Sequence, residues 1–126
     1  MIEIESRCFG QEDLEIYADL TADHNPLHLD AEFAARTSFG RPIVYGTLVI
    51  APLWQAIEAR FGAEALSSAN IEVKFLKPVE IGAWLHYEGG RARETGETTD
   101  YEFTVRSESL GQIVAQVTVC LMKAPP

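Results

Sequence analysis

Residues 21–30 contain one carboxylate and one imidazole, Asp23 and His28, on either side of an Asn25-Pro26 pair. Asn25 precedes a proline and is therefore pushed out of the α-helical region, while Pro26 has no amide hydrogen to donate. On a regular helix the side chains of Asp23 and His28 would point roughly 140° apart. A proline-fixed loop removes that constraint. We therefore expect both side chains to face one pocket, where they would hold two proton carriers beside one water molecule.

The same residues also have a purely structural interpretation. Asp23 and Asn25 are of the types that cap helices and form turns, and His28 can be a hydrogen-bonded structural histidine. Residue types alone leave both interpretations open. The two other histidines, His24 and His86, are expected to be structural or surface residues, because one lies between the loop's candidate residues and the other alternates on a strand.

Composition limits the classes of partner. The chain has 126 residues, which is long enough for one core, and we expect a single domain over residues 1–126. A formal net charge of −9 argues against nucleic acid and against anionic membranes. No signal-peptide pattern opens the sequence and no apolar run reaches the ~18 residues of a membrane span, so we expect a cytoplasmic protein. Cys8 and Cys120 have no metal-ligand spacing and form no disulfide framework, which predicts reduced core residues and no metal site.

Two amphipathic helices are predicted in the first third of the chain. The first spans residues 11–22, and its inward-facing positions are predicted to be Leu14, Ile16, Tyr17 and Leu20. The second spans residues 31–36, with Asp30 as its N-cap and Phe33 on its buried side.

Residues 43–61 are the longest apolar segment and predict a central helix that ends at Gly62. Pro52 lies inside this helix, where proline costs about 3 kcal/mol and usually produces a kink. Most positions from 47 to 53 are apolar, so we expect this part of the helix to be buried nearly all round.

From residue 68 onward, apolar and polar residues alternate with period two. Strands are predicted over residues 70–77, 84–93, 101–108 and 113–122, in addition to a short one within residues 2–9. In the first of these, Ile71, Val73 and Phe75 would point inward, and Gly89-Gly90 would bend or bulge the second. This order of elements indicates an α+β fold with an antiparallel sheet wrapped around a long central helix. Such a sheet has open edges, which small chains often cover by dimerising.

The pattern Asp23-x-Asn25-Pro26-x-His28, followed by Arg-Pro-Ile-Val-Tyr-Gly at residues 41–46, resembles the MaoC-like, (R)-specific enoyl-CoA hydratase family of the hot-dog fold. Residues 73–82 are similar to the strand that follows the central helix in that family. The resemblance extends from about residue 17 to residue 122. It departs at Tyr45, where the family often has histidine, and at Ala22, where it often has glycine.

This resemblance implies a hot-dog fold, a homodimer or higher homo-oligomer, and reversible hydration of a trans-2-enoyl thioester to an (R)-3-hydroxyacyl thioester. It implies that Asp23 and His28 are the catalytic pair, that the Gly46 amide faces the thioester oxygen, and that Asn25 helps to shape the site. No cofactor is implied beyond the coenzyme A, or acyl carrier protein, that is part of the substrate. The basic residues available to bind coenzyme A phosphates are Lys74, Lys77, Arg36, Arg41, Arg91 and Arg93.

The acyl chain is expected to lie along the central helix. Its candidate walls are Val49, Leu53, Trp54, Phe33 and Phe39. Tyr45 is expected to affect substrate choice, and the bulk of Trp54 to favour short acyl chains. Two other functions remain open on the same fold: an acyl-CoA thioesterase and a non-catalytic acyl-thioester binding subunit. The presence of both Asp23 and His28 favours the hydratase.

Overall fold

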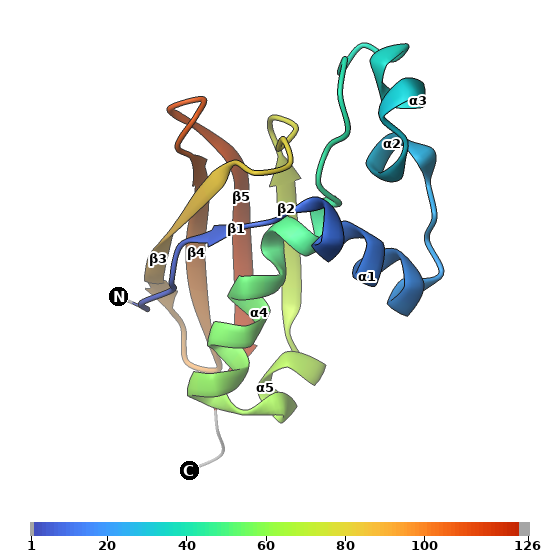
Figure 1. Ribbon diagram of the computed structural model, residues 1–126. Helices are drawn as coiled ribbons and strands as arrows, with labels where there is room; N and C mark the ends of the chain where they lie inside the picture. Colours follow the sequence, from blue (N-terminus) through green and yellow to red (C-terminus); the bar gives the residue numbers. More distant parts are fainter. Residues whose placement is uncertain (1, 124–126) are drawn as a thin grey trace.

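The computed structural model describes residues 2–123, in which one short strand is followed by the helices and then by the remaining strands (Figure 1). The helices are α1 (Gln11–Thr21), α2 (Pro26–Leu29), α3 (Ala31–Ala35), α4 (Gly46–Phe61) and α5 (Ala63–Ser67). The strands are β1 (Arg7–Cys8), β2 (Asn70–Phe75), β3 (Trp84–Glu94), β4 (Thr98–Ser107) and β5 (Gln112–Met122).

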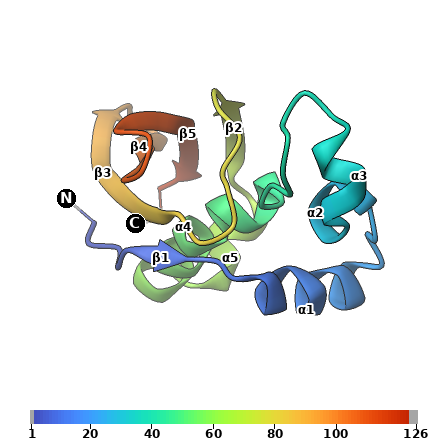
Figure 2. The ribbon, with the colours of Figure 1, turned by 45° about the horizontal axis from the view of Figure 1, so that its top comes forward.

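The strands form one antiparallel sheet in the order β1-β3-β4-β5-β2. The sheet curves around α4, whereas α1, α2 and α3 lie to one side of it (Figure 2). This arrangement confirms the predicted α+β architecture with a central helix. The two edges of the sheet are β1 and β2, and within the described residues each pairs with one strand.

The core lies between α4 and the concave face of the sheet. From α4 it receives Val49, Ile50, Leu53 and Ile57, and from the sheet it receives Leu85, Phe103, Val105, Val117 and Val119. Each of these side chains contributes about 1.5–3 kcal/mol when it is fully removed from water. The period-two alternation predicted for the last two strands is confirmed, because their inward-facing residues are the buried ones.

Helix α4 begins at Gly46 and ends at the predicted C-cap, Gly62, whose φ is 90° and whose amide donates to the Glu58 carbonyl oxygen at 2.8 Å. Pro52 is inside the helix, as predicted, and is buried. The expectation of burial all round was wrong, because Thr47 is exposed at the N-terminal end. Inside the core, the Tyr87 hydroxyl donates to the carbonyl oxygen of Val49 at 2.6 Å.

The inward faces predicted for the two early helices need correction. In α1, Leu14 and Ala18 are buried, but Ile16 is 52% exposed and Leu20 is 80% exposed. In α3, the buried residue is Ala34, whereas Phe33 is 41% exposed. The cause is shared: these helices pack beside the sheet rather than under it, so they bury a narrower stripe than a core-facing helix does.

Strand β2 is also less buried than its alternation indicates. Val73 is partly buried, but Ile71 and Phe75 are 44% and 52% exposed. Because β2 is an edge strand that pairs with β5 on one side, apolar side chains on it remain accessible. The prediction of three inward-facing residues was therefore wrong for two of them.

Strand β3 runs without a break through Gly89, and its register shift falls further on, between Arg91 and Arg93. A Cβ atom at Gly89 would lie 2.1 Å from the carbonyl oxygen of Glu102 on β4. This glycine therefore marks a close approach of two backbones instead of the predicted bend.

The two cysteines, in β1 and β5, are partly buried and carry free thiols. Within residues 2–123, no helix combines the length and hydropathy needed to cross a membrane. The same residues bring together no group of three or more side chains of the His, Cys, Asp and Glu types that could hold a metal ion.

Candidate active site

The segment with the candidate acid and base is a junction between two helices. Helix α1 ends at Ala22, which adopts a left-handed conformation with φ 58° and ψ 24°. Asn25 is then extended, with ψ 123°, and its side chain caps α2 by accepting from the amide of Leu27 at 3.0 Å. The expected non-helical loop is therefore partly wrong, because Pro26 begins α2. Proline suits the first helical position, where no amide donor is needed.

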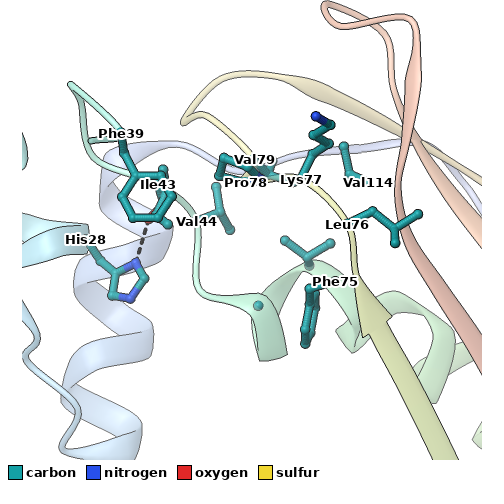
Figure 3. A pocket seen from close by; sticks show the side chains of 12 residues that line it. His28, Phe39, Ile43, Val44, Phe75, Leu76, Lys77, Pro78, Val79 and Val114 are labelled. Carbon is teal, nitrogen blue, oxygen red and sulfur yellow. Dashed lines mark hydrogen bonds between the residues drawn. The ribbon is translucent and has the colours of Figure 1, made fainter. Parts of the chain in front are cut away.

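His28 lies on α2 and is partly buried at one end of a pocket (Figure 3). Its Nδ1 atom is 2.6 Å from the carbonyl oxygen of Ile43. Because a carbonyl oxygen can only accept, Nδ1 carries the ring proton and donates it. In the neutral imidazole, Nε2 then has a free lone pair that can accept a proton.

Asp23 has an exposed side chain, and its Oδ1 atom accepts from the Asn25 amide at 3.3 Å. Among the described residues, the ion pairs within 4.0 Å do not include Asp23 with His28. Asp23 is also not among the residues that line the pocket. The expectation that both side chains face one pocket is therefore met by His28 but not by Asp23.

Tyr45 connects these two residues. Its ring stacks on the imidazole of His28, with centroids 3.9 Å apart and planes 24° apart. Its hydroxyl donates to the main-chain carbonyl oxygen of Asp23 at 2.7 Å. Tyr45 is 3% exposed, and burial, followed by the nearby charges of Asp23 and Tyr17, raises its pKa above the ordinary value. It is not among the residues that line the pocket, and its contact with substrate stays a prediction.

Gly46 is the first residue of α4 and lines the same pocket as His28. Within the described residues its amide has no hydrogen-bond acceptor, as is usual at the start of a helix. A Cβ atom at this position would lie 2.9 Å from Cζ of Phe75, so glycine also makes room for that ring. The site thus contains an imidazole and a free backbone donor at the positive end of a helix dipole.

The pocket has a volume of about 320 Å³ and an apolar lining (Figure 3). It is lined by His28, Phe39, Ile43, Val44, Gly46, Val49, Phe75, Leu76, Lys77, Pro78, Val79 and Val114. Of the predicted walls, Val49 and Phe39 are present, whereas Leu53, Trp54 and Phe33 are not. Leu53 is fully buried in the core, and Trp54 packs against that core.

Sequence reasoning missed the walls supplied by β2 and the segment after it. Phe75, Leu76 and Val79 come from the Val-Lys-Phe-Leu-Lys-Pro-Val run at residues 73–79, which the sequence related to the family fold and not to the pocket. These side chains are accessible because β2 is an edge strand. An edge position depends on the order of strands in the sheet, which the period-two alternation of apolar and polar residues does not reveal.

The candidate cations differ in their availability. Arg41 pairs with Glu80 at 3.0 Å, while Arg91 and Arg93 lie 3.7 Å from Glu94 and 3.5 Å from Asp100. Lys77 is the cation among the pocket-lining residues. It is therefore the best placed of the predicted basic residues to meet an anionic part of a ligand.

The remaining histidines make local contacts outside the pocket. His24 is exposed, and its Nε2 lies 3.2 Å from the carboxylate of Asp19. The Nδ1 atom of His86 is 2.8 Å from the hydroxyl of Ser6. Both agree with the structural or surface roles predicted for them.

Comparisons with known proteins identify relatives of this chain. Residues 2–112 match the family described as the MaoC like domain. An (R)-specific enoyl-CoA hydratase of Aeromonas caviae is 52% identical over 77 residues, which are 61% of this chain and 58% of that protein. The 3-hydroxyacyl-thioester dehydratase Z of Mycobacterium tuberculosis is 30% identical over 113 residues, which are 86% of this chain and 66% of that protein.

A solved structure, the (R)-hydratase from A. caviae involved in PHA biosynthesis, superimposes with a TM-score of 0.77 and 27% identity. The alignment covers 98% of this chain and 93% of that one. By contrast, the sequence matches to curated relatives span about half the length of those proteins: 58% of the A. caviae hydratase, and 46% of a mitochondrial 3-hydroxyacyl-[acyl-carrier-protein] dehydratase of Arabidopsis thaliana that is 37% identical over 78 residues. The expected hot-dog fold is confirmed by these structural neighbours. From its sequence match and its fold, the chain belongs to the MaoC-like domain family.

Proposed function

We propose that this protein catalyses the reversible hydration of a trans-2-enoyl thioester to an (R)-3-hydroxyacyl thioester, with coenzyme A as the carrier. The observation that carries the proposal is the placement of the His28 ring and the Gly46 amide on one apolar pocket. The names of the relatives, a hydratase and a dehydratase of thioesters, support the same reaction class.

In the proposed reaction, the oxygen of one water molecule bonds to C3 while a proton is added at C2. His28 Nε2 is suited to take the proton from water, because Nδ1 is committed to Ile43. Asp23 is the second proton carrier and relays a proton from solvent to C2. The proton gained by one residue and lost by the other is exchanged through solvent before the next turnover, and dehydration is the same path reversed.

The thioester oxygen gains negative charge as the enolate forms between these two steps. The proposed donor is the Gly46 amide, since the N-terminus of α4 favours an anion. Loss of one such donor typically lowers kcat by about 10²–10³. The ring of Phe75 lies against Gly46, so the thioester has to enter between that ring and the helix start.

The apolar lining of the pocket fits an acyl chain, and its volume of about 320 Å³ corresponds to the small end of ligand sites. Lys77 is proposed to meet a phosphate of the carrier. An acyl carrier protein has a phosphopantetheine arm of the same chemistry as coenzyme A, so the assay has to include both carriers.

A homodimer is also part of the proposal. Within the described residues, the edge strand β2 leaves backbone groups unpaired on one side. The strand exposes Ile71 and Phe75, and the residue after it, Leu76, is also exposed. A second copy that covers this edge would bury this apolar surface. Sedimentation equilibrium at micromolar concentration tests this, and a monomer there would contradict it.

The test of the function is hydration of trans-2-enoyl thioesters of coenzyme A and of acyl carrier protein, with acyl chains of four to eight carbons, followed by chiral analysis of the product. The (R)-3-hydroxyacyl thioester is expected. Release of free thiol without hydration would identify a thioesterase. Saturable binding with no turnover on either carrier would identify a binding subunit, and both results would refute the proposal.

A further inference from the structure

Tyr45 contacts both members of the candidate acid–base pair through different parts of its side chain. Its ring face lies on His28, and its hydroxyl reaches the main chain of Asp23. Building on the proposed function, we infer that Tyr45 is a positioning residue that fixes these two groups relative to one another. It would act on the rate of the chemical step through its neighbours and not as a wall for the acyl chain.

The ring of Tyr45 limits the motion of the His28 imidazole. One face of the imidazole is covered by the phenol ring at 3.9 Å, and its edge is held by the bond from Nδ1 to the Ile43 carbonyl oxygen. Ile43 precedes Tyr45 by two residues, so both restraints come from one short stretch of backbone. Together they fix the ring plane and the direction of the Nε2 lone pair.

The hydroxyl of Tyr45 restrains Asp23 from the other side. The main-chain oxygen that accepts its hydrogen bond belongs to the residue directly after the left-handed Ala22. With that carbonyl held at 2.7 Å, the peptide plane after Asp23 cannot turn freely, and the direction of the adjacent side chain is restricted. Burial raises the pKa of the Tyr45 phenol, so it keeps the proton needed for this bond.

Tyr45 is itself anchored to the end of α4 that lies at the pocket. It is the N-cap residue of that helix, and its carbonyl oxygen accepts from the amides of Leu48 and Val49 at 3.0 Å. The ring of Tyr17 lies 4.9 Å from it, and the Tyr17 hydroxyl is hydrogen-bonded to that of Thr47. The acid–base pair is thereby placed relative to the helix start that includes the Gly46 amide.

Two substitutions separate the hydroxyl from the ring. Tyr45→Phe keeps the stacking on His28 and loses the bond to Asp23, so kcat should fall about tenfold. Tyr45→Leu loses both contacts, and kcat should fall on the order of 10²-fold. KM should change by less than about threefold in both, because the side chain lies outside the pocket.

Tyr87→Phe is the matched control, because it removes another buried tyrosine hydroxyl that donates to a main-chain carbonyl, at 2.6 Å. This control should lose a similar amount of stability in urea unfolding and keep kcat within about twofold. Equal kcat losses in Tyr45→Phe and Tyr87→Phe, or a rise in KM at constant kcat, would overturn the inference.

Proton NMR of protein with ¹⁵N-labelled histidine tests the same inference without turnover, so it distinguishes failure of the inference from failure of the proposed function. The wild type and Tyr45→Phe should show His28 as a single tautomer with a slowly exchanging Nδ1 proton. Tyr45→Leu should lose that proton to exchange and populate both tautomers. An unchanged His28 spectrum in a folded Tyr45→Leu variant would refute the inference, whether or not the wild type hydrates enoyl thioesters.

Discussion

The Nδ1 atom of His28 donates to the carbonyl oxygen of Ile43 at 2.6 Å, which leaves Nε2 as the atom that can exchange a proton with a ligand. In the proposed mechanism His28 therefore has two separable roles, one structural through Nδ1 and one chemical through Nε2. His28→Asn places an amide donor near the Nδ1 position and removes Nε2. We expect this variant to fold normally and to lose at least about 10² in kcat. Circular dichroism and steady-state kinetics measure both effects.

His28→Ala provides the comparison for that variant. It removes Nε2 as well, but it also leaves the partly buried Ile43 oxygen without its donor, which costs roughly 1–3 kcal/mol of unfolding free energy. Both variants should therefore be inactive, with only the alanine variant destabilised. Substantial turnover by His28→Asn would show that Nε2 is not a proton carrier.

Asp23 is exposed, so its substitution should leave the folding stability unchanged. Because Asp23 is a proton carrier in the proposed mechanism, the same substitution should lower turnover. Asp23→Asn keeps the size of the side chain and its acceptor for the Asn25 amide, but it removes the ionisable group. We expect kcat to fall by at least about 10² and the urea midpoint to stay unchanged. Asp19→Asn, which changes a nearby exposed carboxylate that pairs with His24, is the control and should retain activity. Similar rates in both variants would exclude Asp23 from the mechanism.

Gly46 has both a steric and a chemical reason to be glycine, and a double-mutant cycle with Phe75 separates them. Gly46→Ala puts a Cβ atom 2.9 Å from the Phe75 ring and should lower both stability and kcat. Adding Phe75→Ala removes the clash and should restore the urea midpoint. We expect kcat to remain depressed relative to Phe75→Ala alone, because the methyl group still blocks close approach of the thioester to the amide. Full recovery of kcat would leave glycine with a packing role only.

Ala22 is the residue with positive φ that is not glycine among the described residues. A left-handed conformation costs an alanine roughly 1–2 kcal/mol. Glycine avoids this cost, but its greater conformational freedom in the unfolded chain cancels part of the gain in stability. Ala22→Gly should therefore raise the unfolding free energy by about 0.5–1 kcal/mol and Tm by a few degrees. Calorimetry measures this, and a lower Tm would show that the left-handed turn is not strained.

Because two tyrosine side chains, Tyr45 and Tyr87, are buried, we expect the folded protein to become less stable at alkaline pH. Burial raises the pKa of Tyr87, against a smaller lowering by the Arg7 charge, and burial also raises that of Tyr45. Below about pH 10 both phenols are protonated in folded and unfolded chains. Above it, the unfolded chain loses these protons first and binds fewer of them, so the unfolding free energy decreases as pH rises.

Urea midpoints between pH 9 and pH 11.5 test this prediction. The wild type should lose stability steadily, and Tyr87→Phe should show a shallower slope because one of the two titrations is removed. Tyr45→Phe should also show a shallower decrease of the urea midpoint with pH. Equal slopes in the wild type and both variants would contradict the expected protonation of the buried phenols.

The sequence allowed the fold to be predicted where local chemistry and burial agree. The caps at Asp30 and Gly62, Pro52 within the central helix, and the alternation of the last two strands are determined by local backbone and packing requirements. The errors have a common origin in tertiary arrangement. Leu20 and Phe75 are apolar residues at the correct period, but their elements lie at the side and the edge of the sheet, and periodicity does not encode that.

In the candidate site, too, local features could be predicted from the sequence and tertiary contacts could not. The spacing of Asp23 and His28 indicated the residues of interest, and the structure places both beside Tyr45. The Nδ1 bond to Ile43 joins positions 15 residues apart and could not be read from either one alone. Leu53 and Trp54 lie on the central helix as predicted, yet the side of α4 that faces the pocket presents Gly46 and Val49 instead, and periodicity does not show which side that is.

The two short helices that follow Asp23 bury little: α2, which contains His28, and α3. None of the residues in α2 is buried, and Ala34 is the buried residue in α3. This part of the molecule therefore has a lower free energy of local opening than the sheet and α4. On warming, turnover should cease while the β-structure is still intact, so the upper working temperature would be set by a few hydrogen bonds at the helix junction and not by the melting of the core.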